Sequence, residues 1–191
     1  PEETVQALLE LSSSLGLEKP AVMGHSLGAQ LAVLLLCKAP DLFSCGIFLS
    51  AWVNPRKKTV AAYSRLAAMS SAALKWSWLV RFQGRYWHFT PAQTQRMAAY
   101  AQNITPEVYR SFFTNTLDLA QHPEYQEVRV PMLAICGSRE VRDMRASLTL
   151  LGENPHCETF LLPGCDHDFP MRRAAVLNPI IDGFLEKHHP A

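Results

Sequence analysis

The sequence lacks long hydrophobic runs and an excess of charge of one sign. Its longest nearly uninterrupted apolar run spans residues 31–37, far fewer than the roughly 18 residues that a membrane-spanning helix needs. The 18 Lys and Arg residues nearly balance the 17 Asp and Glu residues, which leaves a formal net charge of +1. No field of the whole protein therefore favours nucleic acid or an anionic surface. We predict no transmembrane segment and no nucleic-acid partner.

The cysteines lack the spacing of a metal site or a redox motif. The chain has five of them, an odd number without any CxxC or Cys/His pattern: Cys37, Cys45, Cys136, Cys157 and Cys165. Such a set is typical of reduced, mostly buried thiols rather than of a disulfide framework or a zinc site. We therefore predict a reducing, cytoplasmic location, no metal and no cofactor.

What the sequence does have is enough apolar residues for one core. Hydrophobic residues make up 48% of the 191 residues and charged residues 18%, which excludes a disordered, collagen-like or coiled-coil chain. Short apolar segments at residues 21–23, 45–50, 130–137 and 157–162 are predicted strands, and helical patterns occupy residues 4–15, 27–38, 141–151 and 171–187. We expect Pro179 to kink or interrupt the last helix. Continuous apolar strands that alternate with helices predict an α/β fold with a parallel sheet covered on both faces.

A region of different character lies between the second and third predicted strands. It has no convincing strand, several helical stretches, and breaks at Gly84, Pro91, Pro106 and Pro123. We interpret it as a helical insert. The predicted organisation is a first core part (residues 1–54), the insert (55–128) and a second core part (129–191).

The segment Gly24-His25-Ser26-Leu27-Gly28 is a G-x-S-x-G motif between an apolar strand and an apolar helix. A sharp turn of this kind projects the serine hydroxyl clear of the sheet, and the flanking glycines let strand and helix pack without a Cβ clash. The helix N-terminus offers the backbone N–H of Leu27 to a developing negative charge. We predict that Ser26 is a nucleophile; the alternative is a serine that merely caps the helix.

A nucleophilic serine needs a histidine base and a carboxylate that orients it. His167 follows the last predicted strand in a loop that can aim its imidazole over the sheet edge, so we predict it as the base; an ordinary loop histidine is the alternative. Glu140 lies four residues beyond the apolar end of the preceding strand and is the predicted acid. Asp143, three residues further, is an alternative acid, and another acid or none remains a third possibility.

Together these parts resemble the α/β-hydrolase superfamily, in the single-domain group with a cap that includes bacterial esterases, lipase-like enzymes, thioesterases and carbon–carbon bond hydrolases. The resemblance covers residues 1–54 and 129–191. Glu140 lies 114 positions after Ser26, which leaves room for a helical cap, and His167 lies 27 positions after Glu140, which accommodates one helix and one strand. The implied fold is a mainly parallel sheet flanked by helices, with an inserted helical cap.

The resemblance implies acyl transfer. His167 would take the proton of Ser26, which attacks a carbonyl, and water would release the acyl group from the enzyme. We expect a small-molecule carboxylic ester or thioester as the substrate. The alternatives are a non-catalytic binding or signalling protein that keeps the pocket, or a carbon–carbon bond hydrolase or acyltransferase of the same fold.

The insert carries a local excess of positive charge. Residues 55–90 contain seven Lys and Arg residues and no acidic residue, so this stretch is +7 and the rest of the chain is −6. Its interleaved aromatic residues suggest a cap over an apolar acyl pocket, with cations that attract an anionic substrate or a lipid surface. Packing of the aromatic residues onto the core, beside a solvated basic face, is the alternative. The predicted substrate-binding residues are His25, Trp52, Trp76 and Trp78.

The position of the motif near the chain start leads to one further expectation. The chain begins at Pro1 without an initiating Met, and only one predicted helix and one predicted strand precede Ser26, whereas the superfamily normally has several. We expect the chain to lack its N-terminal strands and, with them, a second oxyanion N–H donor and any signal peptide. We therefore expect these 191 residues alone to hydrolyse poorly or not at all.

Overall fold

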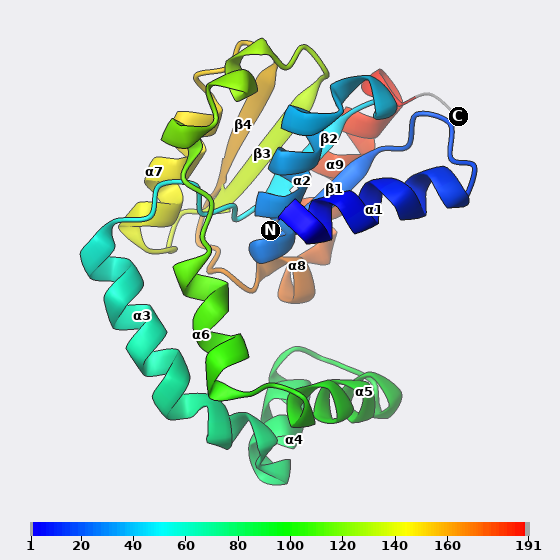
Figure 1. The fold of residues 1–191 in the computed structure, drawn as a ribbon. Coiled ribbons are helices and arrows are strands. Elements are labelled where there is room, and N and C mark those ends of the chain that lie inside the picture. Colours follow the sequence, from blue (N-terminus) through cyan, green and yellow to red (C-terminus); the bar gives the residue numbers. More distant parts are fainter. Residues whose placement is uncertain (1, 190–191) are drawn as a thin grey trace. The chain divides into compact units, whose positions relative to one another are not determined.

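Four short parallel strands form a sheet in the computed structural model, which describes residues 2–189 (Figure 1). The strands are β1 (Val22–His25), β2 (Gly46–Leu49), β3 (Met132–Gly137) and β4 (Cys157–Leu162), and they lie side by side in that order. Every one of the three pairings is parallel, so the carboxyl ends of all four strands meet at one edge of the sheet. The predicted parallel sheet is confirmed.

Helices cover both faces of this sheet. They are α1 (Glu2–Ser14), α2 (Leu27–Lys38), α7 (Arg142–Leu151), α8 (Phe169–Arg172) and α9 (Ala174–His188). In Figure 1, α2 lies in front of the sheet and α9 behind it. Leu36 of α2 packs in one buried cluster with Phe48, whereas Phe184 of α9 packs in a second cluster with Ile47 of the same strand. Neighbouring strand residues thus face opposite helices, which explains the continuous apolar runs in the sequence.

Pro179 was expected to kink or interrupt the last helix, but the helix continues through it. It lies inside α9, which runs from Ala174 to His188, and the break in the predicted segment falls at Arg173 instead. Leu177, Ile181 and Phe184 of this helix are buried against the sheet. Their packing offsets the backbone hydrogen bond that a proline removes.

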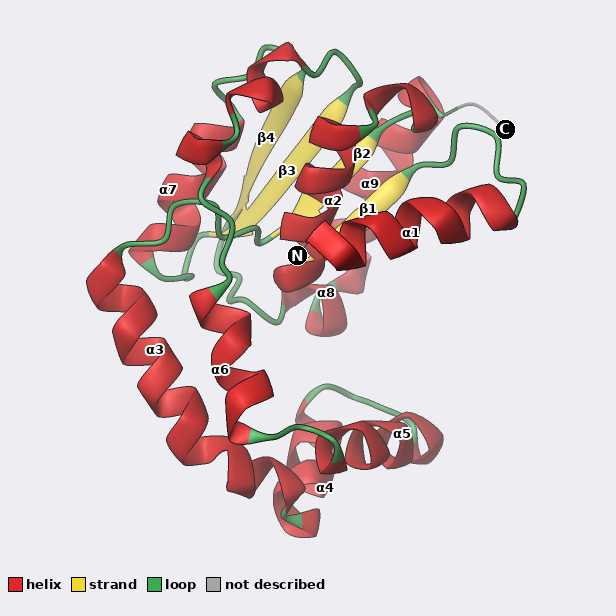
Figure 2. Cartoon of the chain, in the orientation of Figure 1, coloured by secondary structure: helices red, strands yellow, loops and turns green. Residues whose placement is uncertain are grey.

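Residues 56–115 form a second compact unit, whose residues pack mainly against one another. It contains α3 (Lys57–Ser70), a 3₁₀ turn η2 (Ser71–Lys75), α4 (Ser77–Tyr86), α5 (Pro91–Gln102) and α6 (Pro106–Thr114), and no strand among these described residues (Figure 2). Thr90 caps α5 with its side chain and Thr105 caps α6, each followed by a proline at the first helical position. We call this part unit 2 and the remainder unit 1.

Unit 2 ends earlier than the expected insert. Residues 116–128 belong to unit 1, where they form the 3₁₀ turns η3 (Leu119–Gln121) and η4 (Pro123–Glu127). Tyr125 is fully buried in the core, and its hydroxyl donates a hydrogen bond of 2.9 Å to the carbonyl oxygen of Leu151. The absence of a strand made this segment look like part of the insert, but its buried side chains join it to the sheet.

Two further observations bear on the sequence predictions. None of the helices within residues 2–189 has both the length and the apolar character that crossing a membrane requires. All five cysteines are free thiols, and four of them are buried.

Gly24 brings the end of β1 into close contact with the start of α2. A Cβ at this position would overlap with the backbone carbonyl of Gly28, so no other residue fits without a shift of strand or helix. A Cβ at Gly28, by contrast, would meet no heavy atom of the described residues within 4 Å. The expected need for a glycine is therefore right for Gly24 and wrong for Gly28.

This difference predicts opposite effects of two alanine substitutions. Gly24→Ala should lower the free energy of unfolding by about 1–3 kcal/mol or more, because it forces overlap with backbone atoms. Gly28→Ala should leave it unchanged or raise it by up to about 1 kcal/mol, since alanine favours the helix. Urea denaturation of both variants measures this. Equal destabilisation by the two would contradict the packing described for Gly24.

Candidate active site

Ser26 occupies a strained turn between β1 and α2. Its φ of 56° and ψ of −116° lie in a region that residues with a side chain rarely adopt. Its N–H donates a hydrogen bond of 2.8 Å to the carbonyl oxygen of Leu49, which continues the strand pairing up to the turn. Among the described residues its hydroxyl makes no cap hydrogen bond to α2, so the capping role is not what this serine performs.

Three side chains from three separate loops join in one hydrogen-bonded row. His167 Nε2 lies 3.0 Å from Ser26 Oγ, and His167 Nδ1 lies 2.7 Å from Glu140 Oε2. A carboxylate only accepts, so Nδ1 carries the proton, and in the neutral ring Nε2 is left to accept from the serine hydroxyl. The histidine side chain is 44% exposed, whereas the glutamate side chain is fully buried. The reactive end of the row therefore faces solvent and its acidic end is enclosed.

Several donors hold the Glu140 carboxylate in place. Its Oε1 accepts hydrogen bonds of 2.7 Å from Ser50 Oγ and 2.7 Å from the N–H of Gly137, and Cys136 Sγ lies 3.4 Å away. Burial alone would raise the pKa of this group, but the hydrogen bonds from His167, Gly137 and Ser50 outweigh burial and lower its pKa below the ordinary value. Glu140 is therefore ionised at neutral pH.

The loops after β3 and β4 are fixed to one another, which sets the distance between acid and histidine. The N–H of Arg139 donates to the carbonyl oxygen of Cys165 at 3.0 Å, and the N–H of Gly164 donates to Ser138 Oγ at 2.8 Å. A Cβ at Gly137 would overlap with the same Cys165 carbonyl, so glycine is required for this approach.

Ser50 is a site residue that the sequence analysis missed. It directly follows β2, has a φ of 52° and is buried, and its hydroxyl donates to the carboxylate of Glu140. Cys136, also missed, donates its thiol proton to the same oxygen, while burial and the adjacent carboxylate raise the pKa of this thiol. A serine or cysteine near a strand end carries no sequence signal of such a role.

His25 supports the loop of the candidate base. Its Nε2 lies 3.0 Å from the backbone carbonyl oxygen of His167, and the two rings are 4.8 Å apart between centroids. Burial lowers the pKa of His25, and the neighbouring His167 lowers it further. The ring is thus neutral at pH 7 with its proton on Nε2, and it holds the His167 backbone in position.

The other predicted site residues occupy different surroundings. Leu27 is the first residue of α2, where a backbone N–H has no partner within the helix. The partner of His167 is Glu140, and the alternative acid Asp143 is buried in the first turn of α7. Trp52 is only 5% exposed, so little of its ring can contact a ligand. Trp76 and Trp78 belong to unit 2 and are 52% and 61% exposed.

Unit 2 contains two open apolar depressions of its own. One, of about 500 Å³, lies between α4 and α5 and includes Val80, Phe89, Ala98 and the side chains of Arg81 and Arg85. The other, of about 600 Å³, includes Leu74, Trp87 and Met97. Neither depression is lined by Trp76 or Trp78. Within residues 2–189, no group of His, Cys, Asp and Glu side chains has the arrangement of a metal site.

A family model and several solved structures match this chain. A family model described as the alpha/beta hydrolase family matches residues 1–180. A carboxylesterase structure from the thaumarchaeon Nitrososphaera gargenis is 18% identical with a TM-score of 0.69, covering 97% of this chain and 71% of that one.

Two further solved structures show the same degree of similarity. E-2-(acetamidomethylene)succinate hydrolase is 19% identical with a TM-score of 0.68, covering 95% and 72% of the two chains. A thermophilic esterase from Thermogutta terrifontis is 17% identical with a TM-score of 0.68, covering 97% and 71%. At these identities the likeness concerns the fold. No curated protein sequence matches this chain.

The lowered pKa of Glu140 predicts a pH-dependent contribution to stability. Because the folded-state pKa lies below the ordinary 4.5, the ionised group stabilises the fold above about pH 4.5, and this contribution is lost as the pH falls through the folded-state value. Urea denaturation between about pH 3 and pH 5 should therefore show a steeper rise of the unfolding free energy for the wild type than for Glu140→Gln. Glu153→Gln, an exposed change of equal charge, should keep the wild-type slope. Equal slopes for the wild type and Glu140→Gln would refute the assignment.

Proposed function

Because the chain belongs to the alpha/beta hydrolase family, we propose that it hydrolyses carboxylic esters or thioesters through Ser26, His167 and Glu140 and an acyl-enzyme intermediate. The observation that carries the proposal is the continuous row from Ser26 Oγ through both ring nitrogens of His167 to the buried carboxylate. A serine hydroxyl is a weak nucleophile unless such a base accepts its proton.

Each proton in the proposed reaction has a defined place. As Ser26 Oγ bonds to the carbonyl carbon, its proton moves to His167 Nε2, and Glu140 stabilises the imidazolium that forms. The same proton then passes to the departing alcohol or thiol as its bond to carbon breaks. A water molecule next gives a proton to Nε2 while its oxygen attacks the acyl group. Collapse of that intermediate releases the acid and returns the proton to Ser26.

The negative charge of the tetrahedral intermediate needs a donor close to Ser26. The backbone N–H of Leu27, at the N-terminus of α2, supports this role because it points out of the helix end and adds the favourable end of the helix dipole. We propose Leu27 as one oxyanion donor.

We propose further that unit 2 acts as a cap that binds an apolar acyl part of a small-molecule substrate. The support is the apolar lining of its two depressions, of about 500 and 600 Å³, which suit a chain of methylene groups. Of the predicted substrate-binding residues, we propose that His25 positions the base. The substrate-binding roles of Trp52, Trp76 and Trp78 stay predictions, because Trp52 is buried and neither depression is lined by Trp76 or Trp78.

Covalent labelling with a fluorophosphonate probe tests the proposed nucleophile without requiring turnover. The folded protein should be labelled on Ser26, as located by mass spectrometry, and Ser26→Ala should abolish labelling. His167→Ala should slow labelling by at least about 10³-fold, because the base is lost. His156→Ala, a histidine exposed elsewhere in unit 1, serves as the matched control and should label normally. Labelling that is absent, or that survives Ser26→Ala, would favour a non-catalytic binding protein instead.

Two substitutions at Ser50 distinguish the contribution of its hydroxyl from that of its backbone conformation. Ser50→Ala and Ser50→Gly both remove the hydrogen bond to Glu140, and a bond to a charged group contributes about 1.5–3 kcal/mol, so both should lower the labelling rate by about 10- to 100-fold. Glycine also relieves the positive φ, so Ser50→Gly should be more stable than Ser50→Ala by about 1 kcal/mol. If Ser50→Gly labels faster than Ser50→Ala, in line with its higher stability, then Ser50 has only a structural role.

A further inference from the structure

Helix α4 of unit 2 has one buried face and one exposed face. Val80 and Gly84 are buried, and a Cβ at Gly84 would overlap with Thr94 of α5, so this side is pressed against its neighbour. Trp78, Phe82 and Tyr86 follow one another at intervals of four residues and therefore share a face, which lies roughly 120–160° around the helix from Val80. They are 61%, 63% and 46% exposed.

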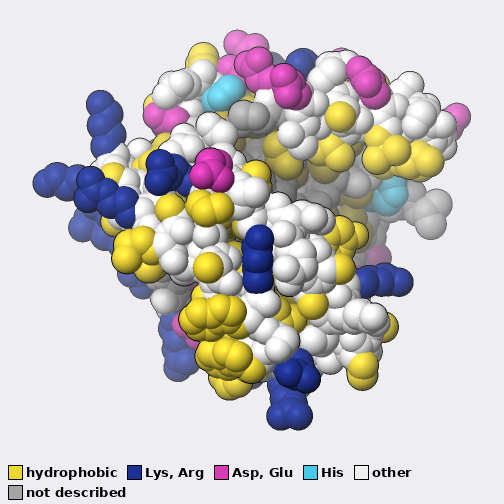
Figure 3. Space-filling view, turned by 60° about the horizontal axis from the view of Figure 1, so that its bottom comes forward, with side chains coloured by type: hydrophobic (Ala, Val, Ile, Leu, Met, Phe, Trp, Pro, Cys, Tyr) yellow, Lys and Arg dark blue, Asp and Glu magenta, His cyan; other side chains and the backbone are white. Residues whose placement is uncertain are grey.

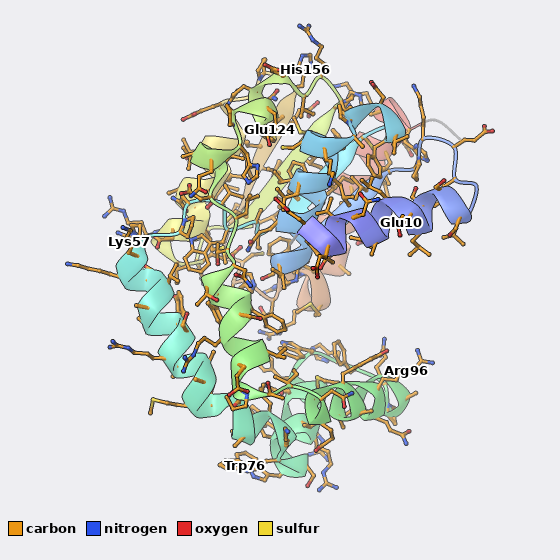
Figure 4. All side chains as sticks on the ribbon, in the orientation of Figure 1. Glu10, Lys57, Trp76, Arg96, Glu124 and His156 are labelled. Atoms are coloured by element: carbon orange, nitrogen blue, oxygen red, sulfur yellow. The ribbon has the colours of Figure 1, made fainter. Side chains whose placement is uncertain are left out.

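Trp76 extends this aromatic face beyond the start of the helix. It is 52% exposed, and its ring stacks on that of Trp78 with 5.9 Å between centroids. Figure 4 places Trp76 beside α4 and Arg96 on α5. Six of the seven exposed aromatic Phe, Trp and Tyr side chains among the described residues belong to unit 2, which holds less than a third of the chain. Exposed aromatic side chains gathered on one helix face are typical of an interaction site. We call Trp76, Trp78, Phe82 and Tyr86 the aromatic face.

Basic side chains border the aromatic face. Lys75 precedes it, and Arg81 and Arg85 each lie one position before an aromatic residue on α4. The space-filling view shows hydrophobic side chains gathered together, with Lys and Arg side chains near them (Figure 3). Unit 2 contains nine of the 18 Lys and Arg residues but only one acidic residue, Glu107, so its formal charge is +8 and that of unit 1 is −7.

We propose that the aromatic face docks onto an anionic lipid surface, with its rings in the interfacial layer and Lys75, Arg81 and Arg85 on the lipid phosphates. Trp and Tyr rings favour the boundary between head groups and acyl chains, and cations beside them are attracted by anionic lipids. A symmetric dimer through the same face is disfavoured, because it would bring the three cations of both copies into one interface. The proposal does not depend on hydrolysis, so Ser26→Ala should bind the surface like the wild type.

Co-sedimentation of the full chain with lipid vesicles tests the proposal. Vesicles of phosphatidylcholine with about 30% phosphatidylserine should bind the protein, and pure phosphatidylcholine vesicles should bind it at least about tenfold more weakly. Tryptophan emission should shift to shorter wavelength on binding, since two of the four tryptophans lie in the aromatic face. Raising the salt concentration should weaken the binding.

Paired variants define which side chains are responsible. Trp78→Ala with Phe82→Ala should weaken binding at least about tenfold, whereas Tyr100→Ala, an exposed aromatic change on α5, should not. Arg81→Glu with Arg85→Glu should abolish binding, whereas Arg129→Glu with Arg173→Glu, which changes the total charge equally in unit 1, should preserve it. Circular dichroism verifies that each variant is folded.

Three outcomes would overturn the proposal. The first is no binding to the anionic vesicles. The second is equal loss of binding in the α4 variants and their matched controls, which would indicate attraction by overall charge only. The third is that the protein does not bind vesicles but self-associates, as measured by light scattering, and that Trp78→Ala with Phe82→Ala abolishes the self-association. The aromatic face would then contact a second copy of the chain.

Discussion

Parallel pairing of four short strands is the constraint on which the candidate site depends. It brings the carboxyl ends of β1, β3 and β4 to one edge, so that Ser26 and His167 come within hydrogen-bond distance although 141 residues separate them. Ser26 directly follows β1, Glu140 lies three residues after β3, and His167 lies five residues after β4. The sheet supplies the rigid edge, and the turns need only to aim one side chain each.

Two serines with positive φ end neighbouring strands in the same way. The N–H of Ser26 bonds to Leu49, the N–H of Ser50 bonds to Ile135, and the chain then turns sharply at both. Each conformation costs on the order of 1–2 kcal/mol. Hydrogen bonds of the two hydroxyls offset this cost. The Ser26 hydroxyl contacts the imidazole of His167, and the Ser50 hydroxyl contacts the carboxylate that orients it. The strained backbone at the two serines thus places the hydroxyls that hold His167 and Glu140 in position.

The sequence contained the strands, the alternation with helices and the three residues of the row, because each follows from a local pattern: a glycine-bordered serine, or a polar residue after an apolar strand. Ser50 and Cys136 could not be found this way, since their roles depend on distances across the sheet. The segment 116–128 was misplaced for a similar reason, since the buried positions of side chains such as Leu117, Tyr125 and Val128, which join it to unit 1, depend on the folded core. Helical spacing indicated that Trp78, Phe82 and Tyr86 share a face, but spacing does not say whether anything covers that face.

The buried thiol beside the carboxylate has a chemical consequence for the site. Burial and the charge of Glu140 keep Cys136 protonated, and oxidants and alkylating reagents act on the thiolate form. Cys136 therefore resists oxidation to a sulfenic acid while the chain is folded, and its position next to the acid does not make the candidate site a redox sensor. Reactivity of this cysteine toward oxidants and alkylating reagents would therefore report unfolding of the chain around Glu140.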